Sequence, residues 1–229
     1  MSEIPTIKVE NVTKTFRLTG ETITALKDIS FAICAGEFIV AAGPSGSGKS
    51  TLLHLLGALD VPDKGKIMVN GRDIAVMSES LRANFRRYEI GFVFQTFSLI
   101  PVLTVYENVE YALLLKGVTK GQRKRMVMET LTTVGLERYA TRYPRQLSGG
   151  QQQRVAVCRA IAGQCTYILA DEPTANLDAK NAMGLMEIMR QLNIERKVTF
   201  IISSHDPRVI SKAERVIYLE DGALRDSTI

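Results

Sequence analysis

A glycine-rich segment has the residue types and spacing of a phosphate-binding loop. It matches the pattern G-x-x-x-x-G-K-[ST] and comprises Gly43, Pro44, Ser45, Gly46, Ser47, Gly48, Lys49, Ser50 and Thr51. Its glycines let backbone N–H groups approach phosphate oxygens, and a helix that begins here adds the positive end of its dipole. We expect Lys49 to contact the outer phosphates of a nucleotide and Ser50 to ligate Mg²⁺.

Two adjacent acids form a second candidate group. Asp171 and Glu172 directly follow an apolar run, residues 167–170. Because Mg²⁺ prefers oxygen ligands, we assign Asp171 to the metal. Glu172 is then available as the general base that accepts a proton from an attacking water. The alternative interpretation is that two neighbouring acids simply terminate a strand.

A third segment is predicted to begin a helix that faces an anion. Ser148 is a good N-cap, Gly149 and Gly150 allow close backbone approach, and a helical pattern runs from Gln151 to Ala162. One chain therefore carries two helix starts suited to an anion. The sequence does not establish whether these two starts act on the same anion.

Predicted strands position these residues. The phosphate loop lies between an apolar run, residues 37–42, and a segment of helical period, residues 50–59. The apolar runs 167–170 and 198–203 are typical of strands buried on both faces, as in parallel sheets. Antiparallel pairs are predicted near both ends of the chain: residues 7–16 with 22–33, and residues 215–220 with 223–226 across a turn at Asp221 and Gly222.

The pattern changes to helical in the middle of the chain. Thr104 and Glu107 have the spacing of a capping box that opens a helix ending near Lys116. A second helix is predicted to begin at Thr119 and to end before Gly135. We therefore expect a helical subdomain inserted into an α/β core.

Composition is ordinary for a globular protein. The 229 residues are 45% hydrophobic and 23% charged, which fits one domain, and no apolar run reaches the roughly 18 residues of a membrane-spanning helix. Residues 1–8 have no apolar targeting region, so we expect the chain to stay in the cytosol. Cys34, Cys158 and Cys165 are expected to be buried reduced thiols. The net charge of +5 suits a nucleotide, an acidic lipid and a nucleic acid equally, so it does not indicate the kind of partner.

The phosphate loop, residues 147–151 and the acid pair, in this order and spacing, resemble the nucleotide-binding subunit of an ATP-binding cassette (ABC) transporter. The resemblance covers almost the whole chain. It implies a P-loop NTPase core of class α/β with a mixed, largely parallel sheet, an N-terminal antiparallel β subdomain and an inserted α-helical subdomain. A single ABC ATPase domain would span residues 1–229, with its core at 1–94 and 152–229 and the helical subdomain at about 95–151.

The resemblance also implies residue roles. Gln95 would touch Mg²⁺ and the attacking water, and His205 would contact the γ-phosphate. Phe16 stands where an aromatic residue, more often tyrosine, stacks on adenine; a core phenylalanine is the alternative. Residues 176–178 would cross a dimer interface, although Asp178 is equally suited to be only an N-cap.

Partners follow from the same resemblance. Two subunits would form a homodimer head to tail, so that Ser148, Gly149, Gly150 and Gln151 of one chain cap the γ-phosphate bound by Lys49 of the other. ATP and Mg²⁺ are the implied ligands. Residues 91–101 and 147–160 resemble the lipoprotein-releasing and macrolide-exporting group of bacterial ABC ATPases. That group implies integral membrane permease subunits, no nucleic acid, and a place on the cytoplasmic face of the bacterial inner membrane.

Two questions stay open at the level of sequence. The apolar residues of one segment are suited equally to a groove for a partner's coupling helix and to core packing; they are Phe97, Leu99, Ile100, Val102 and Leu103. The rival function is a soluble ABC-type ATPase acting on DNA or the ribosome. A small-molecule kinase or GTPase is disfavoured, because the chain has no guanine-reading N-K-x-D sequence and such enzymes do not account for residues 147–151.

Overall fold

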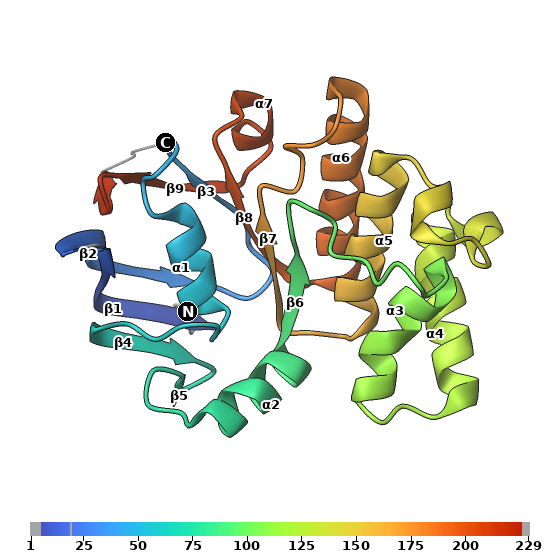
Figure 1. The fold of residues 1–229 in the computed structure, drawn as a ribbon, viewed down its shortest axis with the longest axis horizontal. Helices are drawn as coiled ribbons and strands as arrows, with labels where there is room; N and C mark the ends of the chain where they lie inside the picture. The colour runs from blue at the N-terminus through green and yellow to red at the C-terminus, as the bar shows by residue number, and fades with distance from the viewer. Residues whose placement is uncertain (1–5, 19, 226–229) are drawn as a thin grey trace.

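The computed structural model describes residues 6–18 and 20–225 (Figure 1). Most of the N-terminal stretch in which we expected no targeting region lies outside the described residues, and so does Asp226 at the end of the predicted hairpin. Among the described helices, none is long and apolar enough to cross a membrane.

A six-stranded sheet forms the centre of the molecule, in the order β10-β9-β3-β8-β7-β6. All neighbouring strands are parallel except β10, which runs antiparallel to β9. The bounds are β3 Phe38–Ala42, β6 Ile90–Val93, β7 Tyr167–Asp171, β8 Thr199–Ser204, β9 Arg215–Glu220 and β10 Ala223–Arg225. Every residue of β3 and β8 is buried, as expected for parallel strands covered on both faces. The predicted largely parallel sheet is therefore confirmed.

A separate four-stranded sheet has the order β2-β1-β4-β5 and is antiparallel throughout. Its strands are β1 Ile7–Leu18, β2 Glu21–Ile33, β4 Lys64–Val69 and β5 Arg72–Asp73. The predicted pairing of the first two strands is confirmed. We did not predict β4, because its first three residues are exposed and include two lysines and a glycine, which conceal the apolar positions that follow.

Helices cover both faces of the central sheet. Their bounds are α1 Lys49–Leu56, α2 Glu79–Glu89, α3 Val105–Leu115, α4 Lys120–Thr133, α5 Gly149–Ala162, α6 Ala179–Arg196 and α7 Pro207–Ile210, with 3₁₀ turns η1 Glu137–Tyr139 and η2 Pro144–Gln146. The predicted helix 50–59 was too long: α1 stops at Leu56, and Ala58 adopts a left-handed φ of 50°. Figure 1 shows β1, β2 and β4 at one end of the molecule and α3 and α4 at the opposite end.

Two hydrophobic clusters lie on opposite faces of the central sheet. On β3, Ile39 and Ala41 belong to the cluster shared with α1 and the antiparallel sheet, whereas Val40 belongs to the cluster shared with α3, α5 and α6. This division follows from the two-residue repeat of a strand. The central sheet thus contributes residues to both clusters and separates one from the other.

The helical subdomain has the predicted elements. The Oγ1 of Thr104 accepts a hydrogen bond from the Glu107 N–H at 3.2 Å, and Glu107 accepts one from the Thr104 N–H at 2.8 Å, so the capping box is confirmed. α5 contacts α3 and α4 as well as β6. The predicted subdomain boundary near residue 151 therefore falls inside α5.

Cysteine burial is only partly as expected. All three cysteines are free thiols, but only Cys158 is fully buried, and Cys34 and Cys165 are half-buried. Burial raises the pKa of the Cys165 thiol to about 11, which keeps it protonated at neutral pH.

A buried asparagine fixes the segment that leads into α3. The Asn108 side chain is fully buried; its Oδ1 accepts from the Ile100 N–H at 2.8 Å, and its Nδ2 donates to the carbonyls of Ile100, Leu103 and Thr104 at 2.9–3.1 Å. Removing this amide leaves several backbone groups without a partner in a dry environment.

We therefore expect Asn108→Ala to lower the free energy of unfolding by about 2–3 kcal/mol, because unpaired buried polar groups are costly. Chemical denaturation would measure it. Glu129→Ala is the control, since the exposed Arg125–Glu129 pair is 3.9 Å apart and such pairs contribute less than about 0.5 kcal/mol. Equal losses in the two variants would contradict the role given to Asn108.

Candidate functional site

The carboxyl ends of four adjacent parallel strands bring most of the predicted site residues together. The phosphate loop follows β3, His205 follows β8, Glu172 follows β7, and Gln95 lies two residues beyond β6. Because parallel strands end at the same edge, this edge is where α/β proteins form ligand sites. The cleft has a volume of ≈ 420 Å³ and is lined by Ala25, Ser45, Gly46, Gly48, Lys49, Ser50, Thr51, Gln95, Glu172, Ala175 and His205.

Two glycines of the loop are required by close backbone contacts. Gly43 has φ 147°, and a Cβ there would lie 2.0 Å from the Leu219 carbonyl oxygen. Gly48 has φ 103°, and a Cβ there would lie 2.4 Å from the Ala25 carbonyl oxygen. Both the left-handed backbone and the lack of space exclude larger residues. The glycine spacing in the sequence therefore has a direct steric cause.

The Lys49 side chain extends back along the phosphate loop to the loop's first two residues. Its side chain is buried, and Nζ donates to the carbonyl oxygens of Gly43 and Pro44, both at 2.8 Å. An ammonium group has three N–H donors, so one is not engaged by these two carbonyls. The Oγ of Ser47 is also buried and has no hydrogen-bond partner among the described residues. The loop thus offers donors that suit an anionic ligand.

The two residues assigned to magnesium lie side by side although they are 121 positions apart. Ser50 Oγ donates to Asp171 Oδ1 at 3.1 Å. Among the described residues, no group of three or more His, Cys, Asp or Glu side chains is placed to hold a metal. One hydroxyl and one carboxylate fit Mg²⁺, which keeps several waters and takes further ligands from phosphate oxygens. These donors therefore suit a metal that binds together with a nucleotide.

Ser203 positions both acids and was missed by the sequence analysis. Its fully buried Oγ donates to Asp171 Oδ1 at 2.6 Å and accepts from the Glu172 N–H at 2.9 Å. Ser203 and Asp171 are register partners across β8 and β7. The only available signal was a hydroxyl at the end of an otherwise apolar run, and pairing between strands cannot be read from that.

Glu172 is held in an unusual conformation beside His205. Its φ of 43° is left-handed, which costs a residue other than glycine about 1–3 kcal/mol. Glu172 Oε1 lies 2.9 Å from His205 Nδ1. The glutamate is mostly buried, whereas the histidine side chain is 64% exposed. The Glu172 carboxylate therefore lies in the wall of the cleft, and the His205 ring beside it is exposed to solvent.

Gln95 is exposed at the edge of the same cleft. Its backbone oxygen accepts from Asn176 Nδ2 at 3.0 Å. Asp178 lies two residues after Asn176, and its Oδ1 accepts from the Asn181 N–H at 2.9 Å. This bond confirms Asp178 as the N-cap of α6. A role of residues 176–178 across an interface stays a prediction.

The second predicted anion site is separate from this cleft. Ser148 is confirmed as the N-cap of α5, and it forms a capping box with Gln151 through hydrogen bonds of 3.3 and 2.9 Å. None of Ser148, Gly149, Gly150 and Gln151 is among the described residues that line the cleft. The two helix starts therefore do not converge within one chain.

Phe16 is not a core residue, since its side chain is 39% exposed. The alternative that it packs in the interior was therefore wrong. Phe16 pairs with Ile23 on β2, and Ala25, two residues along the same strand, lines the cleft. Stacking of Phe16 on a base stays a prediction.

A larger apolar groove lies where α2, β6, α3 and α5 meet. Its volume is ≈ 600 Å³, and its apolar lining includes Ile90, Phe92, Phe94, Ile100, Tyr111 and Leu115. Of the five residues predicted for such a groove, only Ile100 lines it, and Leu99 packs against the core. A contact of these five residues with a partner's coupling helix stays a prediction. Phe97 and Ser98 have left-handed φ values of 61° and 49°.

Arg159 connects this groove to the segment that follows Gln95. Its guanidinium lines the groove and donates to the carbonyls of Ser98 at 2.6 Å and Phe97 at 3.3 Å. Burial lowers the pKa of this guanidinium, but an arginine remains charged at neutral pH. The arginine therefore fixes the two left-handed residues, a contact that sequence reasoning did not anticipate.

Comparison with known proteins identifies the family. A family model described as "ABC transporter" matches residues 26–175. The ABC transporter ATP-binding protein YtrE of Bacillus subtilis is 47% identical over 203 residues, which cover 89% of this chain and 88% of YtrE. The lipoprotein-releasing system ATP-binding protein LolD of Bordetella pertussis is 37% identical over 221 residues, which cover 96% of each chain.

A solved structure agrees with these relatives. The dimeric structure of a post-hydrolysis state of the ATP-binding cassette MJ0796 of Methanocaldococcus jannaschii, bound to ADP and Pi, has a TM-score of 0.88 and 43% sequence identity, and the match covers 96% of each chain. The predicted fold class and the predicted resemblance are thereby confirmed. This chain belongs to the ABC transporter family and is an ATP-binding subunit of it.

Proposed function

We propose that this subunit binds ATP with Mg²⁺ and hydrolyses it, and that two copies pair head to tail to drive a membrane permease. The observation that carries this proposal is the single cleft in which Lys49, Ser50, Gln95, Glu172 and His205 meet. Phosphoryl transfer requires donors for the phosphates, oxygen ligands for a metal and a carboxylate for the attacking water. This cleft supplies groups of each kind.

Each residue has a distinct role in this proposal. The loop N–H groups and Lys49 bind the phosphates, and Ser50 and Asp171 hold Mg²⁺. When bound, Mg²⁺ neutralises charge that develops on the phosphate oxygens. Glu172 Oε1 accepts a proton from the attacking water, which Gln95 orients.

His205 has two tasks in the same step. Its Nδ1, 2.9 Å from Glu172 Oε1, holds the carboxylate in position, and the exposed ring is free to meet the γ-phosphate. The backbone of Glu172 is fixed by its left-handed conformation and by the hydrogen bond from its N–H to Ser203 Oγ. Pre-orientation of this kind lowers the reorganisation needed in the transition state.

A second copy completes the site in this proposal. The helix start at Ser148–Gln151 lies outside the cleft of its own chain, so a γ-phosphate can meet it only on a partner subunit. The dimeric state of MJ0796 with ADP and Pi supports pairing. Loss of phosphate would remove the contact between the subunits and shift the population towards separated cassettes. Residues 1–94 and 152–229 form the core in this scheme, and a helical subdomain spans about residues 95–151.

The larger groove is the proposed docking site for the permease. Its lining combines apolar side chains with basic residues, namely Arg86, Arg87, Lys116 and Arg159. An amphipathic coupling helix with apolar and acidic residues fits this surface. Arg159 would pass a change in the groove to the segment next to Gln95. Such a subunit sits on the cytoplasmic face of the bacterial inner membrane.

The name of LolD supports lipoprotein release as the work that this subunit drives. Export and force transmission across the envelope are the other two possibilities in this proposal. The alternative function, a soluble ATPase acting on DNA or the ribosome, is not favoured, because YtrE is named as an ABC transporter protein and LolD as part of a lipoprotein-releasing system. We therefore propose no nucleic-acid partner.

Replacing Glu172 with Gln should keep ATP binding but reduce turnover by about 10²- to 10⁴-fold, since the general base is lost. The trapped complex should elute as a dimer in ATP. Phosphate release and size-exclusion chromatography would measure both effects. Glu187→Gln on α6 serves as control. Turnover near the wild-type rate in Glu172→Gln would remove the general-base assignment.

Ser203→Ala should lower kcat about tenfold, because the loss of both hydrogen bonds, each worth about 0.5–1.5 kcal/mol, loosens Asp171 and Glu172. Ser204→Ala is the matched control. Ser204 is equally buried on the same strand, but its Oγ accepts from the Asp206 N–H at 3.1 Å, away from the acid pair. Steady-state ATPase assays and thermal unfolding of both variants separate catalysis from stability. A similar kcat in the two variants would contradict this role.

Leu115→Glu should reduce the permease-stimulated ATPase rate by more than about fivefold and leave the basal rate unchanged, because it places a carboxylate in the apolar groove. Leu114→Glu is the control, since Leu114 is similarly exposed but does not line the groove. The assay compares the isolated subunit with the membrane complex that co-purifies with it. Equal effects of the two substitutions would argue against the groove as a docking site.

A further inference from the structure

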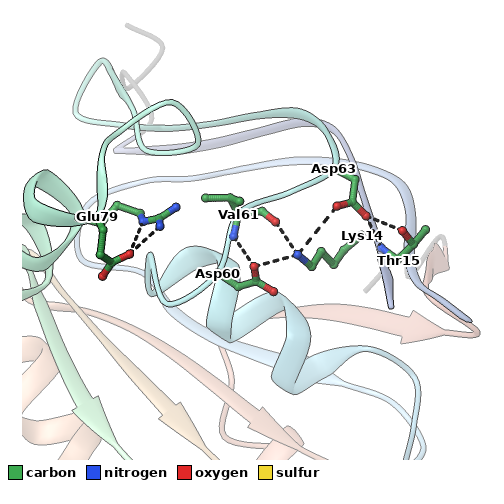
Figure 2. A network of polar contacts seen from close by, with 7 residues as sticks. Lys14, Thr15, Asp60, Val61, Asp63 and Glu79 are labelled. Carbon is green, nitrogen blue, oxygen red and sulfur yellow. Dashed lines mark hydrogen bonds and ion pairs between the residues drawn. The ribbon is translucent and has the colours of Figure 1, made fainter. Parts of the chain in front are cut away.

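Lys14 on β1 is a buried lysine surrounded by acceptors from one short segment. Its side chain is 9% exposed, and Nζ lies 2.8 Å from both Asp60 Oδ1 and the Val61 carbonyl oxygen (Figure 2). Asp63 Oδ1 is 4.0 Å away. Lysine is almost never buried without a partner, so the position of this ammonium group is determined by these contacts.

The same segment is attached to β1 at a second place. Asp63 Oδ2 accepts from both the N–H and the Oγ1 of Thr15 at 2.6 Å, and the Asp63 N–H donates to the Thr13 carbonyl at 2.9 Å. The bond from the Thr15 hydroxyl is the main reason that the pKa of the Asp63 carboxyl lies below its usual value. Residues 60–63 are therefore fixed against β1.

These contacts join two parts of the proposed nucleotide site. Residues 60–63 come shortly after α1, the helix that begins with Lys49 and Ser50. β1 carries Phe16 two residues beyond Lys14, and Lys14 Nζ lies 5.4 Å from the centroid of the Phe16 ring. A cation at this distance is attracted to the face of an aromatic ring. Lys14 thus contacts both the aromatic ring and the segment that follows the phosphate-loop helix.

We propose that Lys14 is a positioning residue for nucleotide recognition, holding the Phe16 ring at a fixed distance from the phosphate loop. The inference rests on the proposed function, in which Phe16 stacks on the adenine of ATP. A ligand that carries both a base and phosphates gains from this fixed distance, whereas a ligand with phosphates alone does not. Lys14 therefore contributes to selection of a nucleotide over other polyphosphates.

The test compares ATP with inorganic tripolyphosphate, which has the phosphates but no base. In Lys14→Met the stem of the side chain stays and the charge is lost. We expect the Kd for ATP, measured by calorimetry with Mg²⁺, to rise about 3- to 10-fold, in line with a cation–aromatic contact. The Kd for tripolyphosphate should change less than about twofold. Lys14→Arg, which keeps the cation, should restore most of the ATP affinity.

Two further variants control for folding and for charge. Lys8→Met removes an exposed lysine that pairs with Glu10 on the same strand, and it should leave both Kd values unchanged. Asp60→Asn keeps Lys14 but removes the negative charge beside it, so it should also raise the Kd for ATP. This variant carries the test if Lys14→Met does not fold. Thermal unfolding of each variant shows whether it is folded.

A double-substitution cycle separates this inference from the function on which it rests. Phe16→Ala should weaken ATP binding about tenfold through loss of stacking, and adding Lys14→Met should then have no further effect. Equal weakening of ATP and tripolyphosphate by Lys14→Met, or additive effects of the two substitutions, would overturn the inference alone. Unchanged ATP affinity in Phe16→Ala would overturn the stacking assignment as well, and absence of ATP binding by the wild-type protein would overturn the proposed function itself.

Discussion

The parallel register of β3, β8, β7 and β6 is the constraint on which the rest of the structure depends. It pairs Ala42 with Ser204, Asp171 with Ser203 and Val93 with Ala170, so that all four strands end at the same level. A slip of one residue would turn Ser203 to the opposite face of the sheet and separate it from Asp171. Burial of both faces makes such a slip costly, since it would also exchange the residues of the two hydrophobic clusters.

The same constraint explains why a polar site can exist beside a dry core. The strands β3, β6, β7 and β8 are apolar through their centres, and the hydroxyl and carboxylate groups of the site lie at their carboxyl ends. There the hydroxyl of Ser203 satisfies Asp171 and the Glu172 backbone, and the loop carbonyls satisfy Lys49. Most buried polar side-chain atoms among the described residues have a partner within the protein, and Ser47 Oγ and Gln153 Oε1 are the exceptions.

Local patterns predicted the parts of the fold that local physics determines. The buried strands β3, β7 and β8 have uninterrupted apolar runs, the capping box of α3 is a contact between residues three apart, and Gly43 and Gly48 are required by backbone geometry. β4 could not be predicted because its apolar residues follow charged ones. Ser203 and Arg159 could not be predicted because their partners are 32 and 61 positions away and are set by strand order and helix packing.

The arrangement of α5 suggests why the proposed site is divided between two chains. Its N-terminus is satisfied locally by the Ser148 and Gln151 side chains, so it needs no ligand to fold. A Cβ on Gly150 would lie 2.9 Å from Asn181 Oδ1, so this glycine lets the turn lie close to α6. In the proposed dimer, a helix start that is capped by its own side chains and does not line the cleft of its own chain is available to an anion held by the other subunit. In the proposed cycle, this independence lets the nucleotide control association without unfolding either subunit.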